Sequence, residues 1–221
     1  NPVGRVWTRE EMARLVELCR KYDVLLLSDE IHDGFIFKGH KHTSVLTFDY
    51  DNVIMLMSAT KSFNLAVLGI SNMIVPRRDY RELISRFMQC NGANNGANNV
   101  FGSVAQRTAY TRCGKWLDEL TEYIEANVDV TLERLAETMP LIKCRKPEGT
   151  YLMWLDARAL GAPDAVFKAL CEAGVGLNRG EGYGVGNQCA GYLRFNVACP
   201  RAQLEAALDC MEKAYRALTA K

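Results

Sequence analysis

The sequence predicts an α/β protein followed by a smaller α+β part. Short, continuous apolar runs such as Val24–Leu27 and Val53–Met57 are typical of strands that are buried on both faces, as in a parallel sheet. Segments with apolar residues at helical spacing separate these runs. After Pro140 the pattern changes to short strand candidates, one of which alternates apolar and polar residues. This change predicts a second structural unit.

The composition is that of an ordinary globular protein. The 221 residues suffice for one large domain or two small ones. The formal charge of +1 gives no reason to expect a nucleic-acid partner, and no apolar stretch has the length of a membrane span. The eight cysteines are scattered without a C-x-x-C pair, and no signal-peptide pattern is present. We therefore expect a cytoplasmic protein without a disulfide framework.

Helices and strands are expected to alternate through the first hundred residues. Thr8 and Glu11 form a capping-box pattern, which predicts a helix through about Tyr22. Strands are expected at residues 24–27, 53–57 and 70–75, and a second helix at 79–90. The stretch Asn91–Asn99 is rich in asparagine and glycine, which predicts a loop, either on the surface or facing an active site.

The rest of the chain predicts two helices and then the second unit. The helices are expected at 101–112 and 116–139, and the longer one could bridge two domains. Further strands are expected at 141–144, 150–155, 175–177 and 192–197, with helices at 162–173 and 200–218. We assign residues 1–113 to part of a large domain, and residues 114–221 to a linking helix and a small C-terminal domain.

Lys61 is the first candidate for chemistry. It lies just past the apolar run 53–57, in the segment Ser58-Ala59-Thr60-Lys61-Ser62-Phe63-Asn64. Desolvation at the end of a buried strand disfavours a charged amine and lowers its pKa. Such an amine is a usable nucleophile toward carbonyl compounds and pyridoxal phosphate. The alternative is an ordinary surface lysine.

Three further side chains are candidates because of where the predicted strands place them. Asp29 and His32 close the first strand, and ligands of parallel α/β sheets bind beyond the carboxyl ends of the strands. A turn or capping role is the alternative for Asp29, and a local structural bond is the alternative for His32. Arg194 lies on the polar face of its strand and can hold a carboxylate through two parallel bonds, unless it is an ordinary exposed arginine.

Two other patterns favour ordinary loops. His40 and His42 suggest a metal site, but their polar setting and the lack of an accompanying carboxylate pattern favour a solvated loop, so no metal is expected. The segment Gly180–Gly186 is rich in glycine. It lacks the following helix and the lysine-serine ending of a phosphate-binding loop.

Four motifs in order along the chain carry a family resemblance. They are Asn1-Pro2-x-Gly4, Ser28-Asp29-Glu30-Ile31-His32, Ser58-x-x-Lys61-x-Phe63-Asn64 and Tyr192-Leu193-Arg194-Phe195-Asn196. With Lys146–Tyr151 and Cys199–Arg201, they resemble class I/II aminotransferase-like proteins, which are pyridoxal-phosphate enzymes of fold type I. The combination is most similar to the cystathionine β-lyase-type carbon–sulfur lyase branch. The resemblance covers nearly the whole chain and implies a mostly parallel sheet remnant of the large domain plus a smaller α+β domain.

The resemblance also implies a role for each matched residue. Lys61 would be the Schiff-base lysine and the proton carrier at the substrate Cα. Asp29 would pair with the pyridinium nitrogen of pyridoxal 5'-phosphate. The implied cofactor-binding set is completed by Asn1 at the 3-oxygen of the ring, Ser58 at the phosphate, and His32. Arg194 would bind the α-carboxylate of the substrate.

The chain departs from the family pattern at several points. His32 stands where many aminotransferases have tyrosine, which favours the lyase branch. The loop 65–70 lacks the phosphate-binding arginine of many aminotransferases, and Val67 stands where the lyase branch usually has glycine. The upstream phosphate loop and the stacking aromatic ring cannot be located, so the chain resembles the C-terminal portion of such an enzyme.

The expected function of the intact protein is therefore pyridoxal-phosphate-dependent β-elimination. It would release a thiol, pyruvate and ammonia from cystathionine or similar cysteine conjugates. An aminotransferase is the first alternative. A catalytically silent domain or interaction module is the second, because this chain lacks part of the implied cofactor pocket. The resemblance further implies a homodimer, with the Asn91–Asn99 loop reaching toward the partner's site.

Overall fold

The computed structural model describes residues 1–91 and 99–220. The described chain divides into two compact units. One comprises Val6–Glu119, and the other comprises Asn1–Arg5 together with Leu120–Lys221. We call them the lysine unit and the arginine unit, after Lys61 and Arg194, and describe each by itself. The described helices include none with both the length and the hydropathy of a membrane span.

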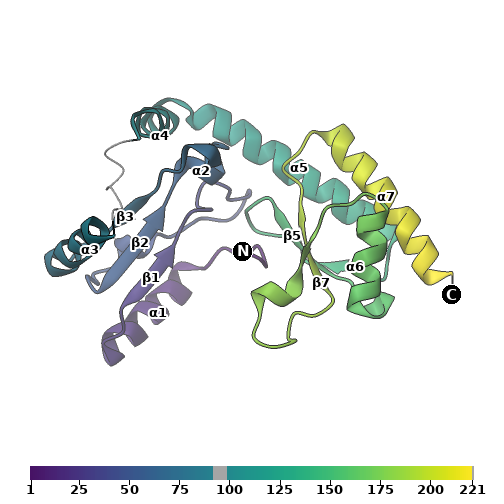
Figure 1. The fold of residues 1–221 in the computed structure, drawn as a ribbon, viewed down its shortest axis with the longest axis horizontal. Coiled ribbons are helices and arrows are strands. Elements are labelled where there is room, and N and C mark those ends of the chain that lie inside the picture. Colours follow the sequence, from purple (N-terminus) through teal and green to yellow (C-terminus); the bar gives the residue numbers. More distant parts are fainter. Residues whose placement is uncertain (92–98, 221) are drawn as a thin grey trace. The chain divides into compact units, whose positions relative to one another are not determined.

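The lysine unit is built on a three-stranded sheet in the order β1-β2-β3 (Figure 1). Its strands are β1 (Leu26–Asp29), β2 (Val53–Met57) and β3 (Asn72–Ile74). Strands β1 and β2 pair in parallel, with Leu26 opposite Val53 and Asp29 opposite Leu56. The sequence predicts that β3 is parallel as well. It is antiparallel to β2. The connection between the two strands holds the four-residue helix Ala59–Ser62, a 3₁₀ turn and irregular residues, but no longer helix of the kind that usually forms a parallel crossover.

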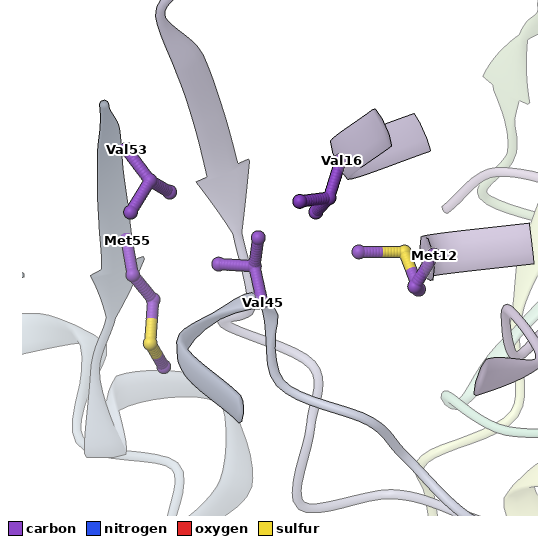
Figure 2. Close-up of a cluster of buried hydrophobic side chains, with 5 residues drawn as sticks. All are labelled: Met12, Val16, Val45, Val53 and Met55. Carbon is purple, nitrogen blue, oxygen red and sulfur yellow. The ribbon is translucent and has the colours of Figure 1, made fainter. Parts of the chain in front are cut away.

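Helix α1 (Arg9–Tyr22) covers one face of this sheet. Thr8 caps it with the reciprocal capping box that the sequence predicts: Glu11 N donates to Thr8 Oγ1, and Thr8 N donates to Glu11 Oε2. The apolar side chains of α1, β2 and the 3₁₀ turn Val45–Thr47 point toward one another in Figure 2. They form the core of the unit: Met12, Val16, Val45, Val53 and Met55.

Strand β1 corrects one expectation from the sequence. The run Val24–Leu27 was predicted to be buried on both faces, but Leu27 is 62% exposed and Val24 is 48% exposed. Leu26 packs against the core, whereas Leu27 lies on the opposite face of an edge strand. The apolar run therefore predicts the strand correctly. It does not predict that both faces of the strand are covered within this chain.

Four helices complete the lysine unit or continue from it. They are α2 (Ala59–Ser62), α3 (Arg78–Cys90), α4 (Val100–Arg112) and α5 (Gly114–Thr138). The sequence predicts α3 from apolar residues at helical spacing, and the helix is present. None of its residues is buried, however, and Leu83 and Phe87 are more than 60% exposed. Its apolar stripe is therefore only partly covered among the described residues.

The arginine unit contains a four-stranded sheet in the order β4-β5-β7-β6, in which every pair is antiparallel. The strands are β4 (Lys143–Cys144), β5 (Leu152–Asp156), β6 (Asn178–Arg179) and β7 (Tyr192–Asn196), and the helices are α6 (Pro163–Glu172) and α7 (Arg201–Thr219). Leu193 and Phe195 of β7 are buried, as their alternation predicts. A strand was also expected at 175–177. The ladder forms at Asn178–Arg179 instead, beyond Gly174 and Gly176.

Polar bonds, some of them buried, join α5 to the end of β7 and to α7. Asn127 is fully buried, and its Nδ2 donates to the carbonyl oxygens of Val197 and Cys199, while its Oδ1 accepts a bond from Arg201 Nε. Arg134 of α5 forms ion pairs with Asp209 and Glu212 of α7. The two bonds that Asn127 donates satisfy carbonyl groups that leave the sheet ladder at the end of β7.

Candidate functional site

Candidate residues of the lysine unit lie at one edge of its sheet. Because β1 and β2 are parallel, with Asp29 opposite Leu56, their carboxyl ends reach the same edge. Asp29 is the last residue of β1, and Ser58 directly follows β2. Lys61 lies on the four-residue helix α2 that begins one residue later. The fold therefore brings Asp29, Ser58 and Lys61 to the region where ligands of parallel sheets bind.

The side chain of Lys61 is exposed, and its amine has no hydrogen-bond or ion-pair partner among the described residues. The desolvation expected from the preceding strand is therefore absent in this chain by itself. The helix that carries Lys61 is nevertheless firmly held, because Ala59 and Ser62 are buried on either side of it. Gln106 of α4 also bonds to this region: its Oε1 accepts from Ala59 N at 3.5 Å, and its Nε2 donates to Asn72 Oδ1 at 3.2 Å.

Ser58 is 2% exposed and is engaged within its own loop. Its Oγ accepts a bond from Thr60 N at 3.0 Å, which caps α2, and donates to the carbonyl oxygen of Ile70. The hydroxyl proton is therefore directed at groups of its own loop, the carbonyl oxygen of Ile70 or Thr60 Oγ1, which lies at 2.9 Å. A phosphate contact, the role implied by the resemblance, requires this hydroxyl to rotate.

Asp29 and His32 occupy the turn that follows β1. Asp29 is exposed, and its Oδ1 accepts a bond from Ile31 N at 3.2 Å. It has no ion-pair partner among the described residues, so its carboxylate retains acceptor capacity for a cationic group. His32 is partly buried, and its carbonyl oxygen accepts a bond from Phe35 N.

An ion pair between the buried Glu30 and the partly buried His42 lies beside these residues and was missed in the sequence. Glu30 is 6% exposed and accepts bonds from His42 Nε2 at 2.8 Å, from Val45 N at 2.9 Å and from Ser28 Oγ at 3.0 Å. The expected solvated loop around His40 and His42 is thus wrong for His42. Its ring turns inward because Glu30 supplies a buried acceptor.

The two partners shift each other's protonation. Burial by itself raises the pKa of Glu30, but the bonds from His42, Val45 and neighbouring hydroxyls bring its pKa below the ordinary value. The bond to Glu30 raises the pKa of His42 above its ordinary value, against the opposing effect of burial. Burial also raises the pKa of nearby Asp33. The pair is therefore charged at mildly acidic pH and fixes the turn that carries Asp29.

In the arginine unit, Arg194 is held by neutral groups. Its Nη1 donates to Asn1 Oδ1 at 3.1 Å, and its Nη2 donates to Asn178 Oδ1 at 3.0 Å. The guanidinium carbon lies 4.8 Å from the ring centroid of Tyr183. The fold thus brings together two of the residues predicted from sequence, Asn1 and Arg194, although 193 positions separate them.

Arg194 has no carboxylate partner among the described residues, whereas several other arginines of its unit do. Arg158 pairs with Asp156, Arg179 with Glu181 and Asp164, and Arg134 with Asp209 and Glu212. The Nε atom of Arg194 is buried without any hydrogen-bond partner. An uncompensated guanidinium with an unused buried donor is suited to a carboxylate ligand.

An aromatic cluster borders this guanidinium. Trp154 of β5 stands opposite Arg194 in the ladder and stacks on Tyr192, with ring centroids 5.4 Å apart and planes at 9°. Trp154 also meets Tyr183 edge to face at 5.5 Å. Tyr183 therefore touches both the tryptophan and the guanidinium, and it fixes one side of the arginine.

Sequence reasoning missed Asn178 and Tyr183 as neighbours of Arg194. Asn178 is the cross-strand partner of Arg194, which requires knowledge of the β6–β7 register. The glycine-rich segment after it pointed instead to a loop without a role. The short distance in sequence between Asn178 and Tyr183, two polar residues that flank a glycine turn, is a weak signal that could have suggested a shared contact.

The Asn91–Asn99 loop was a candidate for an active-site or partner-facing position. Residues 92–98 lie outside the described part of the chain, and Asn95 lies among them. That prediction therefore stays untested by the structure.

Comparisons with known proteins identify the family to which the chain is similar. A family model described as "Aminotransferase class I and II" matches residues 1–210. The chain is 39% identical over 210 residues to cystathionine beta-lyase PatB of Bacillus subtilis strain 168, an alignment that covers 93% of this chain and 53% of that protein. The chain spans about half the length of the curated relatives it matches.

Solved structures agree with the sequence comparison. Cystalysin from Treponema denticola, whose structure contains pyridoxal 5'-phosphate, superposes with a TM-score of 0.91 at 33% identity, covering 99% of this chain and 56% of that one. The PLP-bound C–S lyase from Staphylococcus hominis superposes with a TM-score of 0.83 at 30% identity, covering 98% of this chain and 56% of that one. The match over residues 1–210 and these shared folds show that the chain belongs to the aminotransferase class I and II family.

Proposed function

We propose that the protein containing this chain is a pyridoxal-phosphate-dependent carbon–sulfur β-lyase. It would cleave the Cβ–S bond of cystathionine or a similar cysteine conjugate, and with water it would release a thiol, pyruvate and ammonia. The observation that carries this proposal is Arg194, a guanidinium without a carboxylate partner among the described residues, as binding an amino-acid substrate requires. The relatives named cystathionine β-lyase and C–S lyase support the choice of reaction.

The residues present fit pyridoxal phosphate in their chemistry. Asp29 offers a carboxylate that has no ion-pair partner among the described residues, as a protonated pyridine nitrogen requires. Lys61 offers an amine without a partner in the described chain, as bonding to the cofactor aldehyde requires. Asn1 would hold the 3-oxygen, Ser58 the phosphate, and His32 would lie beside the ring. When bound, the cofactor supplies a sink for the electron pair left at the substrate Cα.

Each side chain then has a defined task in the proposed reaction. Arg194 binds the α-carboxylate and orients the Cα–H bond of the substrate. Lys61, as a neutral amine, removes the Cα proton at its Nζ atom. The electrons of the Cα–H bond form the new Cα–Cβ double bond, and the sulfur leaves Cβ with the Cβ–S electrons. Asp29 stays anionic and would pair with the protonated pyridine nitrogen of the cofactor.

An aminotransferase on the same scaffold is the alternative function. Two of the curated relatives are aminotransferases, and they are 24% and 26% identical to this chain, below the 39% of cystathionine beta-lyase PatB. His32, in the position where many aminotransferases have tyrosine, supports the lyase. Amino transfer to 2-oxoglutarate is the reaction that separates the two functions.

The test uses the full-length protein, purified with added pyridoxal phosphate and incubated with cystathionine. We expect pyruvate and a free thiol in equal amounts, measured with lactate dehydrogenase and a thiol reagent. The variant Lys61→Ala should release neither product, while Lys41→Ala, which changes another exposed lysine of the same unit, should act like the wild type. Transfer of the amino group to 2-oxoglutarate without pyruvate release would favour the aminotransferase.

The second alternative is a catalytically silent domain, and it applies to the 221-residue chain by itself. We expect this chain to develop no visible absorbance band with pyridoxal phosphate beyond that of free cofactor, because the phosphate-binding loop and the stacking ring were not found in it. A yellow complex that disappears in Lys61→Ala would show that this chain suffices for cofactor binding. Self-association into a homodimer also stays a proposal, and sedimentation equilibrium of the full-length protein tests it.

A further inference from the structure

We propose that Asn178 is a positioning residue that keeps the charge of Arg194 available for a carboxylate. Asn178 holds one arm of the guanidinium through a neutral oxygen and so orients it without neutralising it. This inference rests on the role proposed above for Arg194 as the residue that binds the substrate α-carboxylate. It adds a specificity-determining residue from β6, outside the four motifs that carry the family resemblance.

The position of Asn178 follows from the sheet. Arg194 lies on β7 between Trp154 of β5 and Asn178 of β6, its partners in the two adjacent ladders. Partners directly opposite in an antiparallel pair project from the same face. The side-chain oxygen of Asn178 therefore meets Arg194 Nη2 at 3.0 Å, while Asn1 Oδ1 meets Nη1 at 3.1 Å. The two arms of the fork are thus each fixed by an amide.

The donors that remain can serve a ligand. A guanidinium has five N–H groups, and the two amides use two of them. Three N–H groups remain: one on each Nη atom, which a ligand can reach, and the Nε–H, which is buried without a partner and would be exposed only by a small movement. Tyr183 lies against the guanidinium and limits its tilt. The arginine side chain is therefore ordered before any ligand arrives. This lowers the entropic cost of ordering it on binding.

Arg194 is held by uncharged amides, whereas the arginine of the neighbouring strand β6 is held by carboxylates. Arg179, the neighbour of Asn178, pairs with Glu181 and Asp164 and is fully compensated. A carboxylate in place of the Asn178 amide would hold Arg194 equally well or better, since bonds between charged groups are stronger. It would also cancel the charge on which a ligand carboxylate depends. An amide orients the guanidinium without competing with a ligand carboxylate for its charge.

Two substitutions at Asn178 separate a structural role from the proposed one. Asn178→Asp keeps the shape and the acceptor but adds a negative charge 3.0 Å from Nη2. Asn178→Ala removes the acceptor but leaves the site neutral. A merely structural role predicts that Asp is tolerated and that Ala is harmful. The proposed role predicts the reverse order for carboxylate binding.

The experiment titrates the 221-residue chain with sodium acetate against sodium chloride at constant ionic strength and neutral pH. The readout is the side-chain Nε–H signal of Arg194 in ¹⁵N NMR spectra, assigned by its absence in Arg194→Lys. Asn187→Asp is the matched control. It makes the same charge change at an exposed asparagine of the same unit that does not bond to Arg194. Circular dichroism verifies that every variant is folded.

We expect acetate to shift the Arg194 signal saturably in the wild type and in Asn187→Asp. In Asn178→Asp the apparent affinity should fall at least about tenfold, because the new carboxylate competes for the same charge. Asn178→Ala should lose a smaller factor, about two- to fivefold, because the charge attraction remains while one orienting bond is lost.

Two results would overturn the inference. One is binding by Asn178→Asp that equals binding by the wild type, and the other is a wild-type signal that acetate does not move. The pyruvate assay with the full-length protein tests the proposed function separately. An Arg194 signal that responds as expected, in a protein that releases no pyruvate, would refute the lyase and leave the role of Asn178 intact.

Discussion

Arg194 Nη1 donates a hydrogen bond to Asn1 Oδ1 at 3.1 Å, which ties the first residue of the chain to strand β7. Around it, Gly4 and Glu148 add a backbone bond of 2.7 Å between the opening segment and the turn before β5. The segment Asn1–Arg5 thereby belongs to the same compact unit as residues 120–221. The first and fourth of the family motifs are therefore parts of one assembly.

Arg194→Lys should abolish most carboxylate binding by this unit. A lysine ammonium is a point charge and cannot contact Asn1 and Asn178 in the forked geometry that the guanidinium uses. Losing the oriented, charge-assisted bonds should weaken binding of the substrate carboxylate by about 10- to 100-fold. Substrate KM of the full-length protein measures this. An unchanged KM would show that Arg194 does not contact the substrate.

The pair of Glu30 and His42 should make the stability of the lysine unit depend on pH. His42 has a raised pKa in the folded protein, so its stabilising contribution is complete below its ordinary value of 6.5 and is lost as pH rises through the raised value. Glu30 has a lowered pKa, so its contribution is present above its ordinary value of 4.5 and is lost as pH falls through the lowered value. The pair should stabilise most between about 4.5 and 6.5.

Urea unfolding from pH 6 to pH 9 tests this. The wild type should lose stability as pH rises, and His42→Gln should be less stable at pH 6 by about 1.5–3 kcal/mol, the usual contribution of a hydrogen bond to a charged group. The slope against pH should flatten in His42→Gln. His40→Gln, a change at the exposed histidine of the same loop, should behave as the wild type does. Parallel pH profiles for wild type and His42→Gln would contradict the assignment.

Gly34→Ala should displace the helix that carries Lys61. A Cβ at Gly34 would overlap Ser62 Oγ and lie 2.9 Å from Ser62 Cβ, and Ser62 is buried beside Lys61. Overpacking of this kind costs about 1–3 kcal/mol. We expect a lower unfolding midpoint for Gly34→Ala, whereas Gly114→Ala, whose Cβ meets open space at the start of α5, should be neutral or stabilising. Equal midpoints in the two variants would contradict this packing argument.

Asn127→Ala should be among the most destabilising single changes in the arginine unit. The substitution removes both donors to the carbonyl oxygens of Val197 and Cys199 and the acceptor of Arg201 Nε. Buried groups left without partners cost about 1–3 kcal/mol each. Thermal unfolding of Asn127→Ala, compared with the exposed change Asn187→Ala, measures the loss. A difference under about 0.5 kcal/mol would show that water replaces the amide.

Local signals in the sequence predicted many of the elements, because local physics determines them. The capping box of Thr8 and Glu11 places the start of α1 correctly, and the apolar run at 53–57 has the bounds of β2. The alternation of β7 buries Leu193 and Phe195 and leaves Arg194 on the other face. Backbone hydrogen bonding and side-chain period act within a few residues, so a single sequence is enough to predict them.

Pairings between distant segments could not be predicted in the same way. The antiparallel direction of β3 and the inward turn of His42 toward Glu30 depend on which segments meet. The contact of Asn178 with Arg194 depends on strand register, which no local pattern records. The motifs therefore identified residues of the candidate site, while their supporting neighbours became visible only in the folded chain.

The aromatic cluster beside Arg194 gives the arginine unit an optical reporter of its own. Trp154 is the single tryptophan of that unit, since Trp7 and Trp116 belong to residues 6–119. Its indole stacks on Tyr192 and meets Tyr183, the ring that also lies against the guanidinium. In a chain with Trp7→Phe and Trp116→Phe, tryptophan emission should therefore change when an anion reaches Arg194, and occupancy of the arginine could be followed by fluorescence without any label.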